Sequence, residues 1–314
     1  MSDVEFTNFD EMLDSVKGLA PMPTVVVDAA ELHVLQGACE AAKEGLIDPI
    51  LIGDKKKIIT LLEKLDHSTQ LPVIDVPDDA EAAHRGVDLV LKSEARALMK
   101  GHLHTDEFLH PILDHLRGTR RLSHIFIADL STYSKLLYIT DGAINIAPDL
   151  NEKAQIIRNA VELARILGVD KPKVAVLSAI EVVNTQIPSS IDAACLAKMS
   201  ERGQIKHAMV DGPLAFDNAI SKESAGIKGI DSPICGDVDI LLAPDLVSAN
   251  ILAKDLEYLA GARMAGIVMG AQAPVILTSR ADPPEARVLS CAIAALVDHR
   301  TNPGKSSHSG EMSL

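Results

Sequence analysis

The sequence predicts an α/β protein built from two α/β/α lobes with largely parallel sheets and a cleft between the lobes. Short apolar runs of strand length alternate with amphipathic runs of helix length along most of the chain. Hydrophobic residues make up 47% of the 314 residues but aromatic residues only 3%, which is typical of the aliphatic core of α/β enzymes. A polar segment with Gly142 and Pro148 interrupts the alternation near residue 140, where we expect the chain to change lobes.

The first part of the chain is predicted to alternate strands and helices. The apolar runs TVVV, PILI and HIFIA predict buried strands, and Gly45 ends the first predicted helix. Asp78 or Asp79 is expected to cap a later helix. The predicted strands are 24–27, 49–52, 72–75, 124–128 and 135–139, and the predicted helices are 31–44, 55–65, 80–91, 93–100 and 105–116. Repeated β-α-β units imply parallel strands joined by right-handed crossovers.

A second series of elements follows residue 140. Asp149 or Asn151 is expected to cap a long helix that ends before Gly168, and the run KVAVL opens the next strand. The predicted strands are 173–177, 208–210, 239–243, 266–269 and 274–278, the predicted helices are 191–202, 214–221 and 248–260, and a polar loop is expected at 222–232. The tail at 299–314 is polar and rich in Gly and Ser, so we expect it to be frayed.

Charge and cysteine usage narrow the class of protein. The net charge of −14, from 30 basic and 44 acidic residues, disfavours nucleic acid and anionic membranes as partners. The four cysteines are widely spaced without a CxxC pair, which indicates reduced thiols. The sequence shows neither a basic leader before an apolar stretch nor an apolar run of the roughly 20 residues that a membrane helix needs. We therefore expect a cytoplasmic protein.

Ser279 and Arg280 are the strongest candidate site residues. They follow a predicted apolar strand and precede a predicted helix, which is where open α/β folds bind anions. An arginine can hold a phosphoryl group by two donors, and a neighbouring hydroxyl can add a third hydrogen bond. The alternative interpretation is that Arg280 is a solvated loop cation and Ser279 a turn residue.

The residues after Arg280 have a sufficient structural interpretation. Asp282 is expected to cap the final helix, with Pro283 at its first position and Glu285 completing a capping box. Two prolines remove amide donors from the first helical turn. The helix N-terminus then has few amide donors for an anion, so more of the anion binding depends on Arg280.

Three further segments contain candidate substrate-binding groups. In the first, Asp211 is expected at a strand end, and Asp217 and Asn218 follow a Gly-Pro turn. In the second, Thr140, Asp141 and Asn145 lie at the expected lobe junction, where polar groups often line a cleft. In the third, Lys100 and Thr105 lie on either side of Gly101 and could donate hydrogen bonds to phosphate. Capping, a plain hinge and turn formation are the structural alternatives. His102 and His104 lack a third metal ligand, so no metal site is predicted.

These motifs closely resemble the phosphate acetyltransferase and phosphate butyryltransferase family, the phosphotransacylases. The matching pieces, in order, are LMKGHLHT, TDGAINIAPDL, KVAVLSAIEVVN, MSERGQIKHAMVDGPLAFDNAIS, GDVDILLAPDLVSANILAK and GAQAPVILTSRAD. The sequences of the motifs TDGAINIAPDL and TSRADPPEA look more like those of the butyryl-type branch. The resemblance implies a fold related to isocitrate and isopropylmalate dehydrogenases, with residues 1–139 and 286–314 in one lobe and 140–285 in the other.

The resemblance also implies the chemistry. Family members move a short acyl group, acetyl or butyryl, between coenzyme A and inorganic phosphate in a ternary complex, without a tightly bound cofactor. The Ser-Arg pair that binds phosphate falls on Ser279 and Arg280. The family's proposed base falls on Ala286, which leaves Asp282, Glu285, Asp211 and Asp217 as substitutes. A homodimer is the default expectation. The sequence does not predict the acyl-chain preference.

Two other functions remain open from the sequence. A silent acyl-CoA-binding subunit would bind coenzyme A without phosphate-dependent turnover. An NAD-dependent decarboxylating dehydrogenase of the same fold would need metal-binding aspartates and an arginine-rich clamp for a carboxylate, and neither is clear in the sequence.

Overall fold

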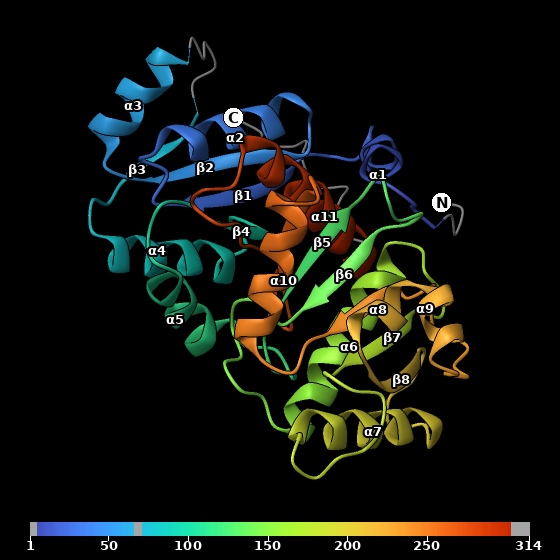
Figure 1. The fold of residues 1–314 in the computed structure, drawn as a ribbon. Helices are drawn as coiled ribbons and strands as arrows, with labels where there is room; N and C mark the ends of the chain where they lie inside the picture. Colours follow the sequence, from blue (N-terminus) through green and yellow to red (C-terminus); the bar gives the residue numbers. More distant parts are fainter. Residues whose placement is uncertain (1–4, 66–70, 303–314) are drawn as a thin grey trace. The chain divides into compact units, whose positions relative to one another are not determined.

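The computed structural model describes residues 5–65 and 71–302, and the chain forms two compact units. Unit 1 comprises Met1–Phe9 and Thr119–Met264, and unit 2 comprises Asp10–Gly118 and Ala265–Leu314. Each unit contains its own sheet strands with helices on both faces (Figure 1). Within the described ranges no helix has both the length and the apolar character to cross a membrane.

Unit 2 is an α/β layer structure with strand order β3-β2-β1-β4-β11-β10. Neighbouring strands are parallel except for the antiparallel pair β10 and β11. The strands are β1 Met22–Val27, β2 Ile47–Gly53, β3 Val73–Asp75, β4 Ala97–Lys100, β11 Val275–Ile276 and most of β10 Arg263–Met269. The helices are α2 Leu32–Lys43, α3 Lys55–Lys64, α4 Asp79–Leu91, α5 Thr105–His115, α11 Pro284–Thr301 and most of α1 Phe9–Val16.

In the topology of unit 2, the chain connections diverge between the neighbouring strands β1 and β4. The chain leaves β1 through α2 toward β2, whereas β4 lies on the other side of β1 and leads into α5. Helix α2 packs on α11, and α5 packs on α4. Ligands of open α/β sheets bind where such connections diverge, beyond the carboxyl ends of the strands. Residues just after β1 and β4 are therefore placed for binding.

Unit 1 has strand order β5-β6-β9-β7-β8, parallel except for β5 against β6. The strands are β5 Ser123–Asp129, β6 Leu137–Thr140, β7 Lys173–Leu177, β8 Met209–Leu214 and β9 Ile240–Leu242. The helices are α6 Leu150–Ile166, α7 Pro188–Glu201, α8 Phe216–Ile220, α9 Lys222–Ile227 and α10 Leu246–Tyr258. Asp149 caps α6 and pairs with Glu152 in a capping box, so of the two predicted caps, Asp149 and Asn151, the structure has Asp149.

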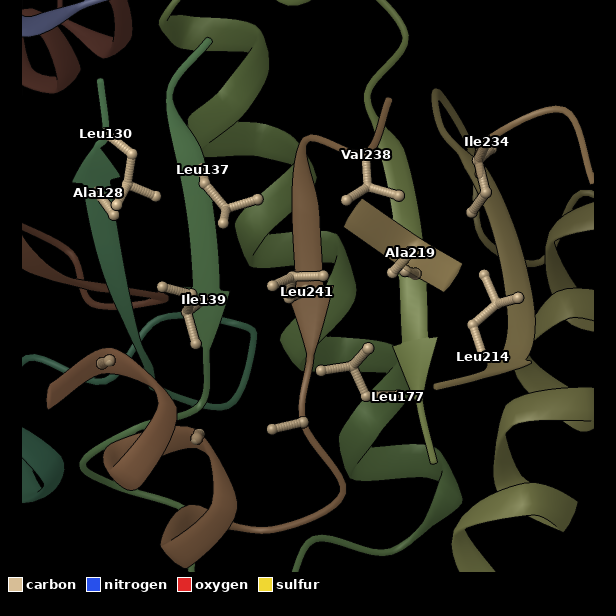
Figure 2. Packing of buried hydrophobic residues seen from close by; sticks show 14 of the residues in the cluster. Ala128, Leu130, Leu137, Ile139, Leu177, Leu214, Ala219, Ile234, Val238 and Leu241 are labelled. Atoms are coloured by element: carbon tan, nitrogen blue, oxygen red, sulfur yellow. The ribbon is translucent and has the colours of Figure 1, made fainter. Parts of the chain in front are cut away.

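The core of unit 1 is aliphatic, as the composition predicts. Leu137 and Ile139 on β6, Leu241 on β9 and Leu177 on β7 present their side chains on one side of the sheet, and α6 lies behind it (Figure 2). Small residues of α8, α9 and α10, among them Ala219, complete the same cluster. Alanines on these helices let them lie close to the strands.

Removal of the Leu241 side chain tests this packing. Leu241 is fully buried on the central strand β9, so Leu241→Ala is expected to lower the free energy of unfolding by about 3 kcal/mol through lost burial and a residual cavity. Leu259→Ala is the matched control, because Leu259 is 84% exposed and should change stability by less than about 0.5 kcal/mol. Urea unfolding of both variants measures the difference. Equal losses in the two variants would contradict the packing described here.

Two predicted elements are wrong. Residues 93–100, expected as a helix, end in β4, which is fully buried and pairs with β1 and β11. Pairing on both sides outweighs the local helix propensity of this segment. The polar loop expected at 222–232 contains α9, whose first turn is capped by Ser221.

The two compact units change at 9/10, 118/119 and 264/265. The lobe boundaries at 139/140 and 285/286 stay a prediction. Strand β5 pairs with β6, so residues 119–139 cluster with unit 1. Strand β11 pairs with β4, so the segment that leads to α11 clusters with unit 2.

Candidate anion-binding site

The strongest candidate residues gather at one sheet edge of unit 2. Lys100 ends β4 beside Val27, the last residue of β1, and Met99 pairs with Ile276 on β11. Because β1, β4 and β11 are parallel, their carboxyl ends meet at the same edge. Asp28, Lys100 and the Ser279–Arg280 pair each follow or end one of these three strands.

Ser279 begins a tight turn that Asp282 closes. The Asp282 carboxylate accepts the Ser279 amide at 2.7 Å, and the Asp282 amide donates to the Ser279 carbonyl at 3.3 Å. The Ala281 amide donates to Ser279 Oγ at 3.4 Å. The hydroxyl oxygen thus accepts from within the turn, and its proton can be donated to a ligand.

Asp282 does not cap the final helix, so that prediction is wrong. Helix α11 begins at Pro284 with Pro283 in the cap position and no side-chain cap hydrogen bond. A cap at Asp282 would place Pro284, which has no amide proton, at the second helical position and leave only the Glu285 amide as a donor to the cap. The buried Asp282 carboxylate bonds to Ser279 instead. Its role is to shape the turn that carries the Ser-Arg pair.

Two cations of different exposure lie at this edge. Arg280 is exposed, and its guanidinium makes no hydrogen bond or ion pair within residues 5–65 and 71–302. Lys100 is only 3% exposed, and its ammonium donates to the Gly101 carbonyl at 3.3 Å. Burial, and then the charges of Arg280 and Arg287, lower the pKa of Lys100 to about 8. Arginines that disfavour the charged form of Lys100 make a cationic environment, which favours the binding of an anion.

The loops after β1 and β4 lie so close together that any side chain at position 101 would clash with the backbone of the other loop. A Cβ at Gly101 would lie 2.0 Å from the Asp28 carbonyl oxygen. Two backbone bonds join the loops: the Gly101 amide donates to Val27 at 2.8 Å, and the His102 amide donates to Asp28 at 3.0 Å. Asp28 adopts a left-handed φ of 51°, uncommon for a residue other than glycine. Burial and then Asp79 raise the pKa of its carboxyl group. Thr105, the other predicted donor of this segment, is the first residue of α5.

Arg287 contacts the turn that carries Ser279 and Arg280, and the sequence interpretation did not name it. It is fully buried, and its guanidinium donates to the carbonyls of Asp282 at 3.0 Å and Ser279 at 3.2 Å. The available signal was a single arginine in the run ARVLSCAIAALV, which is apolar on every side of a helix. A charge in such a run is buried, so it must bond to nearby polar groups.

The candidates after β6 in unit 1 bond to one another. Asp141 accepts the amides of Ala143, Ile144 and Asn145 at 3.0, 3.1 and 3.3 Å. The Asn145 side chain donates to Asp141 and to the Leu122 carbonyl, and it accepts from Arg121. Thr140 Oγ1 donates to the His124 carbonyl at 2.9 Å. These hydrogen bonds hold the buried loop after β6 in place. Substrate contact by Thr140, Asp141 and Asn145 stays a prediction.

Asp211 and Asp217 have separate partners. Asp211 lies inside β8, not at the expected strand end, and accepts from Ser232 Oγ at 2.5 Å. Asp217 is ion-paired with Lys228 at 2.9 Å, and this hydrogen-bonded cation lowers the pKa of Asp217. Asn218 is fully buried and donates to Glu181. The structure therefore links Asp217 and Asn218 through Lys228 and Glu181, but not to Asp211.

The possible metal ligands and the buried Cys291 thiol were the remaining candidates for chemistry in the described part of the chain. No group of three or more His, Cys, Asp or Glu side chains is arranged to hold a metal ion there. Burial raises the pKa of the Cys291 thiol to about 12, so this cysteine is a poor nucleophile.

Known proteins match most of this chain. The family model of phosphate acetyl/butaryl transferases matches residues 78–295. A phosphate acetyltransferase of Rickettsia typhi is 48% identical over 94% of this chain and 86% of its own length. A phosphate butyryltransferase of Clostridium beijerinckii is 41% identical over 93% of this chain and 98% of its own.

A solved structure has the same fold. The branched-chain phosphotransacylase of Enterococcus faecalis V583 superposes with a TM-score of 0.78 and 33% identity, over 88% of this chain and 99% of its own. Of the two curated relatives, the acetyltransferase is the more identical, which does not favour the butyryl-type branch. The family model and the relatives both span most of the sequence, and the chain therefore belongs to the phosphate acetyl/butyryl transferase family.

Proposed function

We propose that this protein transfers a short acyl group reversibly between coenzyme A and inorganic phosphate in a ternary complex. The proposal makes it an acyltransferase whose substrates are acyl-CoA with phosphate, or acyl phosphate with coenzyme A. The observation that carries it is the cationic edge of unit 2, where Ser279, Arg280 and Lys100 follow or end neighbouring strands. No tightly bound cofactor takes part in this reaction.

In this proposal the edge of unit 2 binds the phosphoryl group. Arg280 offers a planar fork of donors that matches two phosphoryl oxygens. The Ser279 hydroxyl donates its proton to a third oxygen while it accepts the Ala281 amide. The Lys100 ammonium supplies charge from the floor of the site. Donors fixed in advance stabilise the charge that develops as acyl phosphate reacts.

The bond changes balance as follows. The coenzyme A thiol loses its proton to a carboxylate, the thiolate attacks the acyl carbon, and the C–O bond to phosphate breaks with its electron pair leaving on phosphate. The candidate carboxylates differ in their partners. Lys228 pairs with Asp217 and lowers its pKa, and Asp282 accepts the Ser279 amide. Asp211 has no ion pair within the described ranges, and its carboxylate accepts the Gly212 amide and the Ser232 hydroxyl.

A panel of acyl-CoA substrates tests the function. Acetyl-, propionyl-, butyryl- and longer acyl-CoA are each incubated with and without phosphate, and thiol release is measured. We expect release only with phosphate, with the acyl preference given by the relative rates. Coenzyme A binding without turnover would instead identify a silent binding subunit, and an absorbance change from a nicotinamide cofactor would identify a dehydrogenase. We also propose a homodimer, which light scattering in solution tests.

A further inference from the structure

We propose that Arg287 is a positioning residue for phosphate transfer, whose buried guanidinium holds the Ser279–Asp282 turn in the shape that presents Ser279 and Arg280 to the ligand. This inference rests on the proposed function, since it takes phosphate as the ligand of the turn. Arg287 itself is not expected to touch substrate, because the side chain is fully buried behind the turn.

The contacts of Arg287 span the turn from one end to the other. Its two terminal nitrogens donate to the first and last carbonyls of the turn, on Ser279 at 3.2 Å and Asp282 at 3.0 Å. The only backbone bond across the turn, from the Asp282 amide to the Ser279 carbonyl, is long at 3.3 Å. The Asp282 carboxylate fixes the Ser279 amide from inside the turn. Loss of the guanidinium removes a donor from each of the two carbonyls and leaves the turn to the long Asp282–Ser279 backbone bond and the Asp282 carboxylate contact.

The buried charge argues for a geometric role. Arginine is rarely fully buried, and burial lowers the pKa of Arg287, although the charges of Asp282 and Glu31 act in the opposite direction. An apolar side chain of similar volume is often as stabilising as a buried ion pair. What such a side chain cannot supply is a planar pair of donors at fixed spacing. The benefit of Arg287 is therefore the geometry of the turn.

Helix α2 confines the Arg287 side chain from the other side. A Cβ added at Gly37 would lie 2.9 Å from both Cβ and Cδ of Arg287 and 3.2 Å from the Pro284 carbonyl oxygen. Helices α2 and α11 pack together here, and glycine makes the room that the arginine stem occupies. Gly37→Ala therefore moves the guanidinium without removing it.

The central experiment compares Arg287→Met and Arg287→Lys with Arg96→Met. Arg96 is the matched control, because it pairs with Asp298 of the same helix at 2.9 Å and bonds no part of the turn. For Arg287→Met we expect KM for phosphate to rise roughly 10- to 30-fold, while KM for acyl-CoA changes less than about twofold. Arg287→Lys keeps the charge but not the fork and should recover only part of the loss. Arg96→Met should lose stability with both KM values unchanged.

Chemical rescue separates positioning from general stability. Millimolar guanidinium chloride added to Arg287→Ala should restore KM for phosphate, whereas the same concentration of sodium chloride should not. Unchanged phosphate KM in Arg287→Met, or equal rises in both KM values, would overturn the proposal. If the Arg287 variants do not fold, Gly37→Ala provides the test, and it must raise KM for phosphate selectively.

Sulfate binding measured by calorimetry distinguishes the two possible failures. If wild type releases no thiol with phosphate, the proposed function fails, yet weaker sulfate binding in Arg287→Met than in Arg96→Met would still support the positioning role. If wild type is active and both variants bind sulfate equally, the positioning role alone fails.

Discussion

Arg280→Ala is expected to lower kcat/KM for phosphate by about 10²- to 10³-fold, the usual effect of removing a fixed donor from a developing anion. Arg280 is exposed, and the described part of the chain offers its guanidinium no internal partner. Its removal therefore leaves no buried group unsatisfied, and stability should change by less than about 0.5 kcal/mol. Thiol release at varied phosphate concentration measures the effect.

Two companion variants make this result specific to the phosphate contact. Arg280→Lys keeps a positive charge but loses the two-point geometry, so its activity should lie between that of wild type and alanine. Arg117→Ala removes another exposed arginine of unit 2, one that follows α5 rather than β11, and should remain fully active. Near-normal phosphate-dependent turnover in Arg280→Ala would refute the site.

The parts of this site that are local in sequence could be predicted. Ser279 and Arg280 follow an apolar run that is followed by a helix, and this order alone indicates a strand end facing a helix start. The same reasoning offered Asp149 or Asn151 as the cap of α6, and Asp149 is the cap. In each case the residues that define the feature lie within a few positions of one another.

The parts that depend on distant partners could not be predicted. Strand β4 is a strand because β1 and β11, about 70 and 180 residues away, pair with it on both sides. Arg287 acts on a turn that precedes its own helix, and α2 confines it at Gly37. Asp282 has a capping pattern in the sequence, but its carboxylate accepts the Ser279 amide and the helix begins at Pro284. Tertiary geometry decides the first two cases, and in the third two local patterns compete for one carboxylate.

Lys100→Met is expected to lower kcat/KM for phosphate about 10²-fold and to remove a pH dependence of anion binding. The pKa of Lys100 is lowered to about 8, by burial first and then by Arg280 and Arg287. As pH rises through about 8 the ammonium loses its proton, so the attraction for an anion falls and the Kd rises. Arginine side chains in general do not titrate over this range. Sulfate is the better probe, because it stays doubly charged while phosphate itself titrates.

The variants predict three distinct pH profiles for sulfate binding by calorimetry. In wild type the Kd should begin to rise near pH 8. In Lys100→Met the Kd should be higher than in wild type and constant from pH 7 to 10. In Lys100→Arg the Kd should also be constant, because arginine does not titrate there, but the affinity should fall less than in Lys100→Met. A wild-type Kd that stays constant to pH 10 would contradict a titrating Lys100.

Stability gives an independent readout of opposite sign. The unfolded chain keeps the Lys100 proton up to its ordinary pKa of 10.5, whereas the native state releases it near 8. Between these values the unfolded state binds more protons, so native stability rises with pH relative to Lys100→Met, by about 3 kcal/mol in total. Urea unfolding of both proteins across this window measures the change. As the pH rises, native stability should therefore increase while sulfate affinity decreases. Both changes are expected together only if the same buried ammonium binds the anion and opposes folding, because loss of one proton then causes both.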